Sequence, residues 1–155
     1  MYNLLTSAGM ERLKGRLHEL KTQDLARAQA EVIHSREEGK LEENESYLHA
    51  QENCKMVERR IAELADVVEN YEVSLTRPPS DHAGFGSTLL IEDAESGKQR
   101  RVTLVGEPEA DIKLGSISIT SPLGSALMGA VEGDMVEVLV PKGMMKYEIL
   151  EITAQ

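Results

Sequence analysis

Residues 37–47 read Glu37-Glu38-Gly39-Lys40-Leu41-Glu42-Glu43-Asn44-Glu45-Ser46-Tyr47 and separate two long segments with helical periodicity. Five glutamates fall within nine residues of this stretch, around a glycine. Glycine and clustered charge are typical of a solvated turn. The stretch therefore predicts a helical hairpin that carries its acidic residues at the tip, far from any core.

Both flanking segments have the apolar spacing of amphipathic helices. Before the turn, the stripe consists of Met10, Leu13, Leu17 and Leu20, followed less regularly by Leu25, Ala28 and Val32. After the turn, it consists of Leu48, Cys54, Val57, Ile61, Leu64, Val68 and Tyr71. Ser7 is expected to cap the first helix through its hydroxyl. Narrow stripes joined by a short link favour an antiparallel pair within residues 1–76.

The sequence pattern changes after Thr76. Pro78 and Pro79 cannot continue a helix and indicate a linker. Short runs rich in aliphatic and β-branched residues follow, separated by turn residues, at 87–91, 99–105, 117–120, 135–140 and 146–152. Residues 121–129 are expected to form a short helix, with Ser121 as its cap and Pro122 at its first position. The fold class is therefore α+β with two domains, a hairpin over 1–76 and an antiparallel sheet with one helix over 77–155.

The composition excludes several classes of function. The chain has 155 residues and a formal net charge of -10, which argues against broad binding to a phosphate backbone. The chain contains one Phe, four Tyr and no Trp. So few aromatic side chains argue against a protein that binds single strands by stacking bases on aromatic rings. A single cysteine, Cys54, cannot form an internal disulfide and fits a reducing cytosol. No signal peptide and no membrane-spanning segment are expected.

No catalytic constellation is visible in the sequence. The four histidines, His18, His34, His49 and His82, are scattered singly, and Cys54 is expected to pack in the hairpin. The acidic turn has two interpretations. It is either an ordinary solvated turn or a means of delivering carboxylates, which are suitable ligands for a hard cation such as Mg²⁺.

Several ordered motifs nevertheless give the chain a family resemblance. The tip motif is Arg36-Glu37-x-Gly39-x-Leu41-x-Glu43-Asn44-x-x-Tyr47. The second half contains Phe85-Gly86-Ser87, Val105-Gly106-x-x-Glu109-Ala110-Asp111, Ser121-Pro122-Leu123 and Pro141-x-Gly143. In these motifs and their order the chain resembles the bacterial transcript cleavage factors of the GreA/GreB family over nearly its full length.

This resemblance implies a coiled-coil hairpin followed by an FKBP-like domain without prolyl isomerase activity. It also implies a cytoplasmic protein that is not itself an enzyme and that binds RNA polymerase at the mouth of its secondary channel. Asp111, Ser121 and Pro122 lie in the motifs of the docking domain. The hairpin would reach nascent RNA only at the active centre. No membrane, small-molecule substrate or cofactor of its own is expected, since the Mg²⁺ is shared with the polymerase.

The resemblance places Glu43 at a metal-proximal position, with Glu42 and Glu45 as substitutes and with Gly39, Lys40, Leu41, Asn44 and Tyr47 shaping the tip. Lys40 is a departure, because cleavage-competent members have an aspartate directly after the glycine. A protonated lysine cannot bind Mg²⁺. Two alternatives therefore stay open beside a cleavage factor: a channel-occupying modulator or inhibitor of RNA polymerase, and a coiled-coil adaptor unrelated to it.

Overall fold

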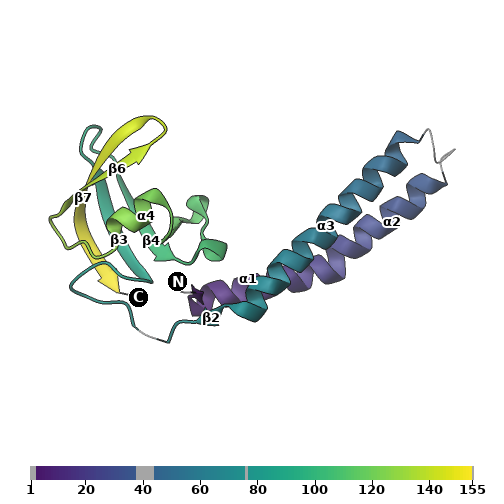
Figure 1. The fold of residues 1–155 in the computed structure, drawn as a ribbon, viewed down its shortest axis with the longest axis horizontal. Helices are drawn as coiled ribbons and strands as arrows, with labels where there is room; N and C mark the ends of the chain where they lie inside the picture. The colour runs from purple at the N-terminus through teal and green to yellow at the C-terminus, as the bar shows by residue number, and fades with distance from the viewer. Residues whose placement is uncertain (1–2, 38–43, 76, 155) are drawn as a thin grey trace. The chain divides into compact units, whose positions relative to one another are not determined.

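The computed structural model describes residues 3–37, 44–75 and 77–154. The chain forms two compact units (Figure 1). One unit comprises Met10–Tyr71, and the other comprises Met1–Gly9 together with Glu72–Gln155. The first nine residues thus belong with the second half of the chain, whereas the sequence analysis grouped them with the hairpin.

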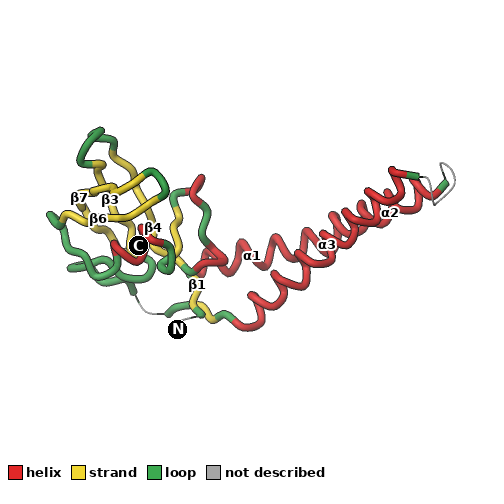
Figure 2. The backbone as a smooth tube through the Cα atoms, turned by 45° about the horizontal axis from the view of Figure 1, so that its top comes forward, coloured by secondary structure: helices red, strands yellow, loops and turns green. Residues whose placement is uncertain are grey.

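The first unit is the predicted antiparallel hairpin. Its first arm consists of α1 (Ser7–Glu19), η1 (Leu20–Asp24) and α2 (Leu25–Arg36), and its second arm is α3 (Glu45–Asn70). Figures 1 and 2 show α2 and α3 side by side. One position of the predicted stripe is wrong, because Leu48 is 51% exposed and Ala50 occupies the buried position instead.

The η1 segment is a π-helical turn that explains why the first stripe continues irregularly. Residues Leu13, Leu20, Ala28 and Ser35 are buried, at steps of seven, eight and seven. An α-helix turns by about 100° per residue, so a step of eight would rotate the next side chain about 80° off the stripe. A π turn accommodates one additional residue. It lies within the step of eight, where the N–H of Leu25 donates to the carbonyl of Leu20, and therefore keeps Ala28 and Ser35 on the buried face.

The helix cap predicted at Ser7 lies one residue earlier. The Thr6 hydroxyl oxygen accepts the N–H of Gly9 at 3.0 Å, and Ser7 is the first helical residue. The Thr6 N–H in turn donates to the carboxylate of buried Glu109 at 2.9 Å. A side chain at position 9 would overlap this carboxylate, so any residue other than glycine there would displace the end of the Glu109 side chain. These contacts and the parallel pairing of β1 (Leu4–Leu5) with β2 (Glu72–Val73) place the N-terminal segment in the globular unit.

The second unit is built on a five-stranded sheet of order β5-β4-β3-β7-β6. The strands are β3 (Ser87–Asp93), β4 (Gln99–Val105), β5 (Ser116–Ser118), β6 (Met135–Val140) and β7 (Gly143–Ala154). All pairs are antiparallel except β4 with β5, which is parallel. The connection between those two strands includes the 3-10 turns η2 (Glu107–Glu109) and η3 (Ile112–Leu114).

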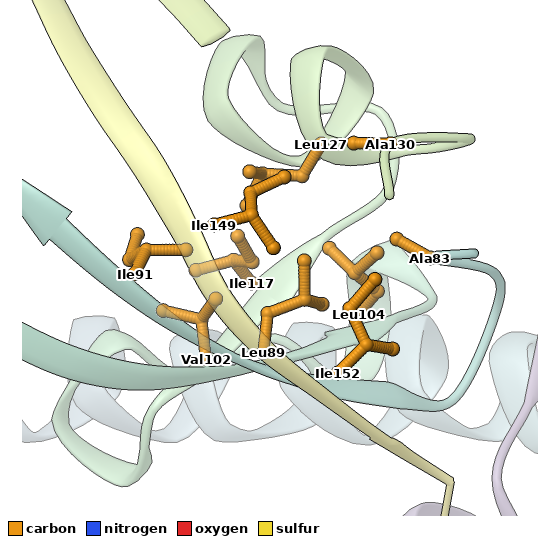
Figure 3. Close-up of a cluster of buried hydrophobic side chains, with 10 residues drawn as sticks. All are labelled: Ala83, Leu89, Ile91, Val102, Leu104, Ile117, Leu127, Ala130, Ile149 and Ile152. Atoms are coloured by element: carbon orange, nitrogen blue, oxygen red, sulfur yellow. The ribbon is translucent and has the colours of Figure 1, made fainter. Parts of the chain in front are cut away.

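One face of this sheet holds the hydrophobic core. Figure 3 shows the aliphatic cluster, in which Leu127 from α4 (Pro122–Leu127) meets sheet residues such as Ile149. A register shift between Leu90 and Ile91 interrupts the pairing of β3 with β7. The predicted cap is confirmed, because the Ser121 hydroxyl oxygen accepts the N–H of Gly124 at 3.0 Å. The two-domain α+β class is therefore confirmed.

Candidate functional site at the end of the hairpin

The sequence predicts functional residues at the link between α2 and α3. Five of them, Gly39, Lys40, Leu41, Glu42 and Glu43, lie outside the described residues. The structure describes the two ends of the link. Glu37 follows the last turn of α2, where its N–H donates to the carbonyl of His34 at 3.2 Å.

Asn44 joins the two helices at this end of the hairpin. Its side-chain oxygen accepts the N–H of Tyr47 at 3.1 Å, so Asn44 is the N-cap of α3. Its side-chain nitrogen donates to the carbonyl of Ser35 at 2.5 Å, within the last turn of α2. The first N–H groups and last carbonyls of a helix have no partner within that helix. A single amide therefore bonds to a backbone group at the end of each arm.

Ser35 is a residue that the sequence analysis did not single out. Its side chain is 1% exposed, and its hydroxyl donates to the carbonyls of Glu31 at 2.8 Å and Val32 at 3.1 Å. Because the Ser35 hydroxyl bonds to carbonyls of its own helix, this buried polar group is not left without a hydrogen-bond partner. The sequence signal for the burial of Ser35 is its small size and its position seven residues after Ala28. Its polarity conceals this signal, because the rest of the stripe is apolar.

The first turn of α3 contains the remaining described tip residues. Tyr47 is half-buried, and its hydroxyl oxygen accepts the side-chain N–H of Gln51 at 2.9 Å. Glu45 is exposed and is the first residue of the helix. A carboxylate at that position interacts favourably with the helix dipole. Glu45 therefore has a structural benefit independent of any metal.

A groove lies along the hairpin between α2 and α3. Its volume is about 310 Å³, and its lining residues are Asp24, Arg27, Ala28, Glu31, Asn53, Val57 and Arg60. Two carboxylates and two guanidinium groups line it together. Because both signs of charge are present in equal number, the groove does not select an anion or a cation.

The three predicted docking residues lie on either side of β5. The Asp111 carboxylate accepts the N–H of Lys113 at 3.0 Å and begins η3. Ser121 is the N-cap of α4, and its hydroxyl donates to the carbonyl of Ser118, the last residue of β5, at 2.6 Å. Pro122 is exposed at the first helical position. All three therefore have local structural roles, which do not by themselves define a binding surface.

Two titratable side chains away from the tip have shifted acidities. Burial and the neighbouring Glu58 carboxylate raise the pKa of the Cys54 thiol. The imidazole of His82, 2.7 Å from the Asp81 carboxylate, lowers the pKa of that exposed acid. Neither group forms part of a cluster. Among the described residues, no group of three or more His, Cys, Asp or Glu side chains could hold a metal, and no helix has the length and apolarity to cross a membrane.

Two family models together span nearly all of the chain. The model described as "Transcription elongation factor, N-terminal" matches residues 3–73, and "Transcription elongation factor, GreA/GreB, C-term" matches residues 78–154. The chain belongs to the GreA/GreB family of transcription elongation factors.

Two sequence relatives that the chain covers almost completely agree with this family assignment. The transcription elongation factor GreA of Anaeromyxobacter sp. (strain K) is 41% identical over 149 residues, which are 96% of this chain and 90% of the relative. GreA of Thioalkalivibrio sulfidiphilus is 39% identical over 150 residues, covering 96% and 95% of the two chains. The crystal structure of the GreA factor homolog 1 protein of Thermus thermophilus aligns over 99% of both chains, with 28% identity and a TM-score of 0.46.

Proposed function

We propose that this protein binds RNA polymerase at its secondary channel and stimulates cleavage of nascent RNA in backtracked or arrested complexes. The globular unit docks at the channel mouth, and the hairpin brings residues 37–45 to the active centre. The observation that carries this proposal is the family membership of both halves together with the acidic composition of the link. The protein works in the cytoplasm and does not catalyse the reaction alone.

The dimensions of α3 support a role in reaching a recessed site. Its 26 residues correspond to about 39 Å, at about 1.5 Å per residue. The pairing of α3 with the first arm buries residues along the shared stripe, including Ala28 and Val57. A paired helix of this length can carry polar residues far from the opposite end of the hairpin. An adaptor hairpin would need the same length, so the composition of the tip must distinguish the two functions.

Carboxylates at the link fit the chemistry of a magnesium ion that belongs to the polymerase. Mg²⁺ prefers oxygen ligands and is commonly held by one or two carboxylates with several waters. When bound, a second metal neutralises developing charge and activates a water for hydrolysis. Glu43 is the proposed metal-proximal acid, with Glu42 or Glu45 as substitutes. Glu45 competes least well for this role, since it already begins α3.

Lys40 favours a second candidate function. A lysine ammonium has no lone pair for a metal and repels it while protonated. With Lys40 where an aspartate is expected, the protein would occupy the channel and modulate or inhibit nucleotide addition without stimulating cleavage. This second function uses the same docking and the same hairpin.

A cleavage assay on halted, backtracked elongation complexes tests the proposal. We expect the wild-type protein to shorten the RNA and Glu43→Ala to lose most of that activity. Glu52→Ala is a matched control, because Glu52 is an exposed glutamate within α3. Slowed nucleotide addition without RNA shortening by the wild-type protein would favour the modulator. Absence of polymerase subunits from a pull-down with bacterial lysate would refute both and support an adaptor.

Docking through the region around β5 is the remaining part of the proposal. Asp111, Ser121 and Pro122 belong to the family-like motifs, and the exposed apolar residues Ile112 and Leu114 follow Asp111 in η3. Exposed apolar side chains next to polar groups are common in protein interfaces. Replacing Ile112 with Asp should weaken polymerase binding and leave the fold intact, since this side chain is 79% exposed.

A further inference from the structure

The identity of Asn44 is not explained by helix capping alone. Asp, Ser and Asn cap helices about equally well, because each side chain offers an oxygen to the first free N–H groups. Only Asn among these three also presents an N–H donor on a side chain of the same length. In this structure that donor contacts the carbonyl of Ser35 at 2.5 Å. The second hydrogen bond is therefore one that the side chain of Asn44 makes through its amide nitrogen, which Asp and Ser lack.

The small, buried side chain of Ser35 is compatible with the hydrogen bond between Asn44 and the Ser35 carbonyl. Its side chain is small and bonded within its own helix, to the carbonyls of Glu31 and Val32. A larger residue at this buried position would separate the last turn of α2 from α3. The Ser35 carbonyl lies in the last turn of α2, where the N–H of the C-cap Glu37 also points at it, and it remains within reach of Asn44.

We propose that Ser35 and Asn44 form a clasp that fixes the separation of the two helix ends, and that Asn44 is a positioning residue for the tip acids. Glu37 and Asn44 are the described residues at which the chain leaves and rejoins the hairpin. Fixing both ends restricts where the link can place its carboxylates, which lowers the entropic cost of arranging them around a metal. The role in positioning rests on the proposed cleavage function, whereas the clasp itself does not.

Two substitutions separate the clasp from the cap. Asn44→Asp and Asn44→Ser both retain an oxygen for the Tyr47 N–H, and both remove the amide N–H that donates to the Ser35 carbonyl. The serine variant adds no charge. Asn70→Asp controls for the added charge, because Asn70 is an exposed residue at the opposite end of α3.

The first measurement does not involve polymerase. Spin labels at exposed positions 33 and 48, introduced as Ile33→Cys and Leu48→Cys in a Cys54→Ser background, report the distance between α2 and α3 by pulsed electron paramagnetic resonance. We expect a broader distance distribution in Asn44→Asp and Asn44→Ser and an unchanged one in Asn70→Asp. An unchanged distribution in both Asn44 variants would overturn the clasp, whatever the protein does to polymerase.

The second measurement tests positioning through the metal dependence of RNA cleavage. We expect both Asn44 variants to raise the Mg²⁺ concentration for half-maximal cleavage roughly two- to tenfold, the equivalent of one hydrogen bond. Polymerase affinity should stay within about twofold of the wild type, because the docking unit is unchanged. A broadened distribution with unaltered metal dependence would overturn the positioning role. A wild-type protein that stimulates no cleavage would refute the proposed function and this role with it, while a broadened distribution would still establish the clasp.

Discussion

Deletion of Gln23 is predicted to leave the hairpin folded and in register. Gln23 is an exposed residue of the π turn. The buried residues Leu13, Leu20, Ala28 and Ser35 are now separated by seven, eight and seven positions. Removing Gln23 makes all three separations seven, which a regular pair of helices accommodates. All four buried positions keep their face, so the free energy of unfolding of the hairpin should change by no more than about 1 kcal/mol.

The matched control is deletion of Lys14, an exposed residue of α1 outside the π turn. This deletion shortens the step from Leu13 to Leu20 from seven residues to six. The residues before position 14 are thereby rotated about the helix axis by about 100° relative to those after it. Met10 and Leu13, which are 5% and 9% exposed, would leave the buried face. At about 1.5–3 kcal/mol for each buried side chain, the loss should be about 3–6 kcal/mol.

Native-state hydrogen exchange of hairpin peptides measures both effects, and peptides from the five-stranded sheet serve as an internal reference. The two deletions should differ by several kcal/mol in the opening free energy of the hairpin. If deletion of Gln23 destabilises the hairpin as much as deletion of Lys14, the π turn does not absorb the extra residue and the explanation of the stripe is wrong.

Three further predictions concern the tip and two glycines. Lys40→Asp should increase RNA cleavage in backtracked complexes, because a carboxylate replaces a cation near the proposed metal; unchanged cleavage rates would show that the lysine is not limiting. Gly15→Ala should stabilise the hairpin by about 0.5–1 kcal/mol, since Gly15 is helical and an added methyl group meets nothing within 4 Å. Gly124→Ala should instead destabilise the globular unit by about 1–3 kcal/mol, because the methyl group would overlap the carbonyl of Ser118. Calorimetric unfolding of both variants checks the opposite signs, and two shifts of the same sign would contradict the packing argument.

The clasp illustrates how a residue can be selected for two contacts at once. Asn44 was expected to shape the tip because it belongs to the tip motif. Its contact with Ser35 relates residues nine positions apart in two different helices. Such a contact has no periodic signature, because it depends on how closely the two helices approach at that end.

The helices themselves were predictable because their information is local and periodic. Leu13, Leu20 and Val57 lie at positions where helical spacing predicts burial, and all three are buried. Leu48 followed the same pattern and is exposed. The pattern fails there because the smaller Ala50 takes the buried position at this end of the hairpin.

The N-terminal segment shows the same limit in the other unit. Its sequence continues directly into a helix, so periodicity grouped it with the hairpin. In the folded protein, Thr6 bonds to Glu109, more than a hundred residues away, and β1 pairs with β2. Partners so distant in sequence are selected by the folded sheet and its connections.

The sequence by itself determined the hairpin, the α+β globular unit, the family and the concentration of acids between the two helical arms. Hydrophobic periodicity, turn residues and ordered motifs are properties of neighbouring positions, so a linear sequence displays them. The tertiary structure decided the π turn at Leu20–Asp24, the cap at Thr6, the N-terminal strand and the bond between Asn44 and Ser35. Each of these features depends on the rotation of a helix about its axis or on the distance between two packed elements. Both are fixed only when the buried faces pack together.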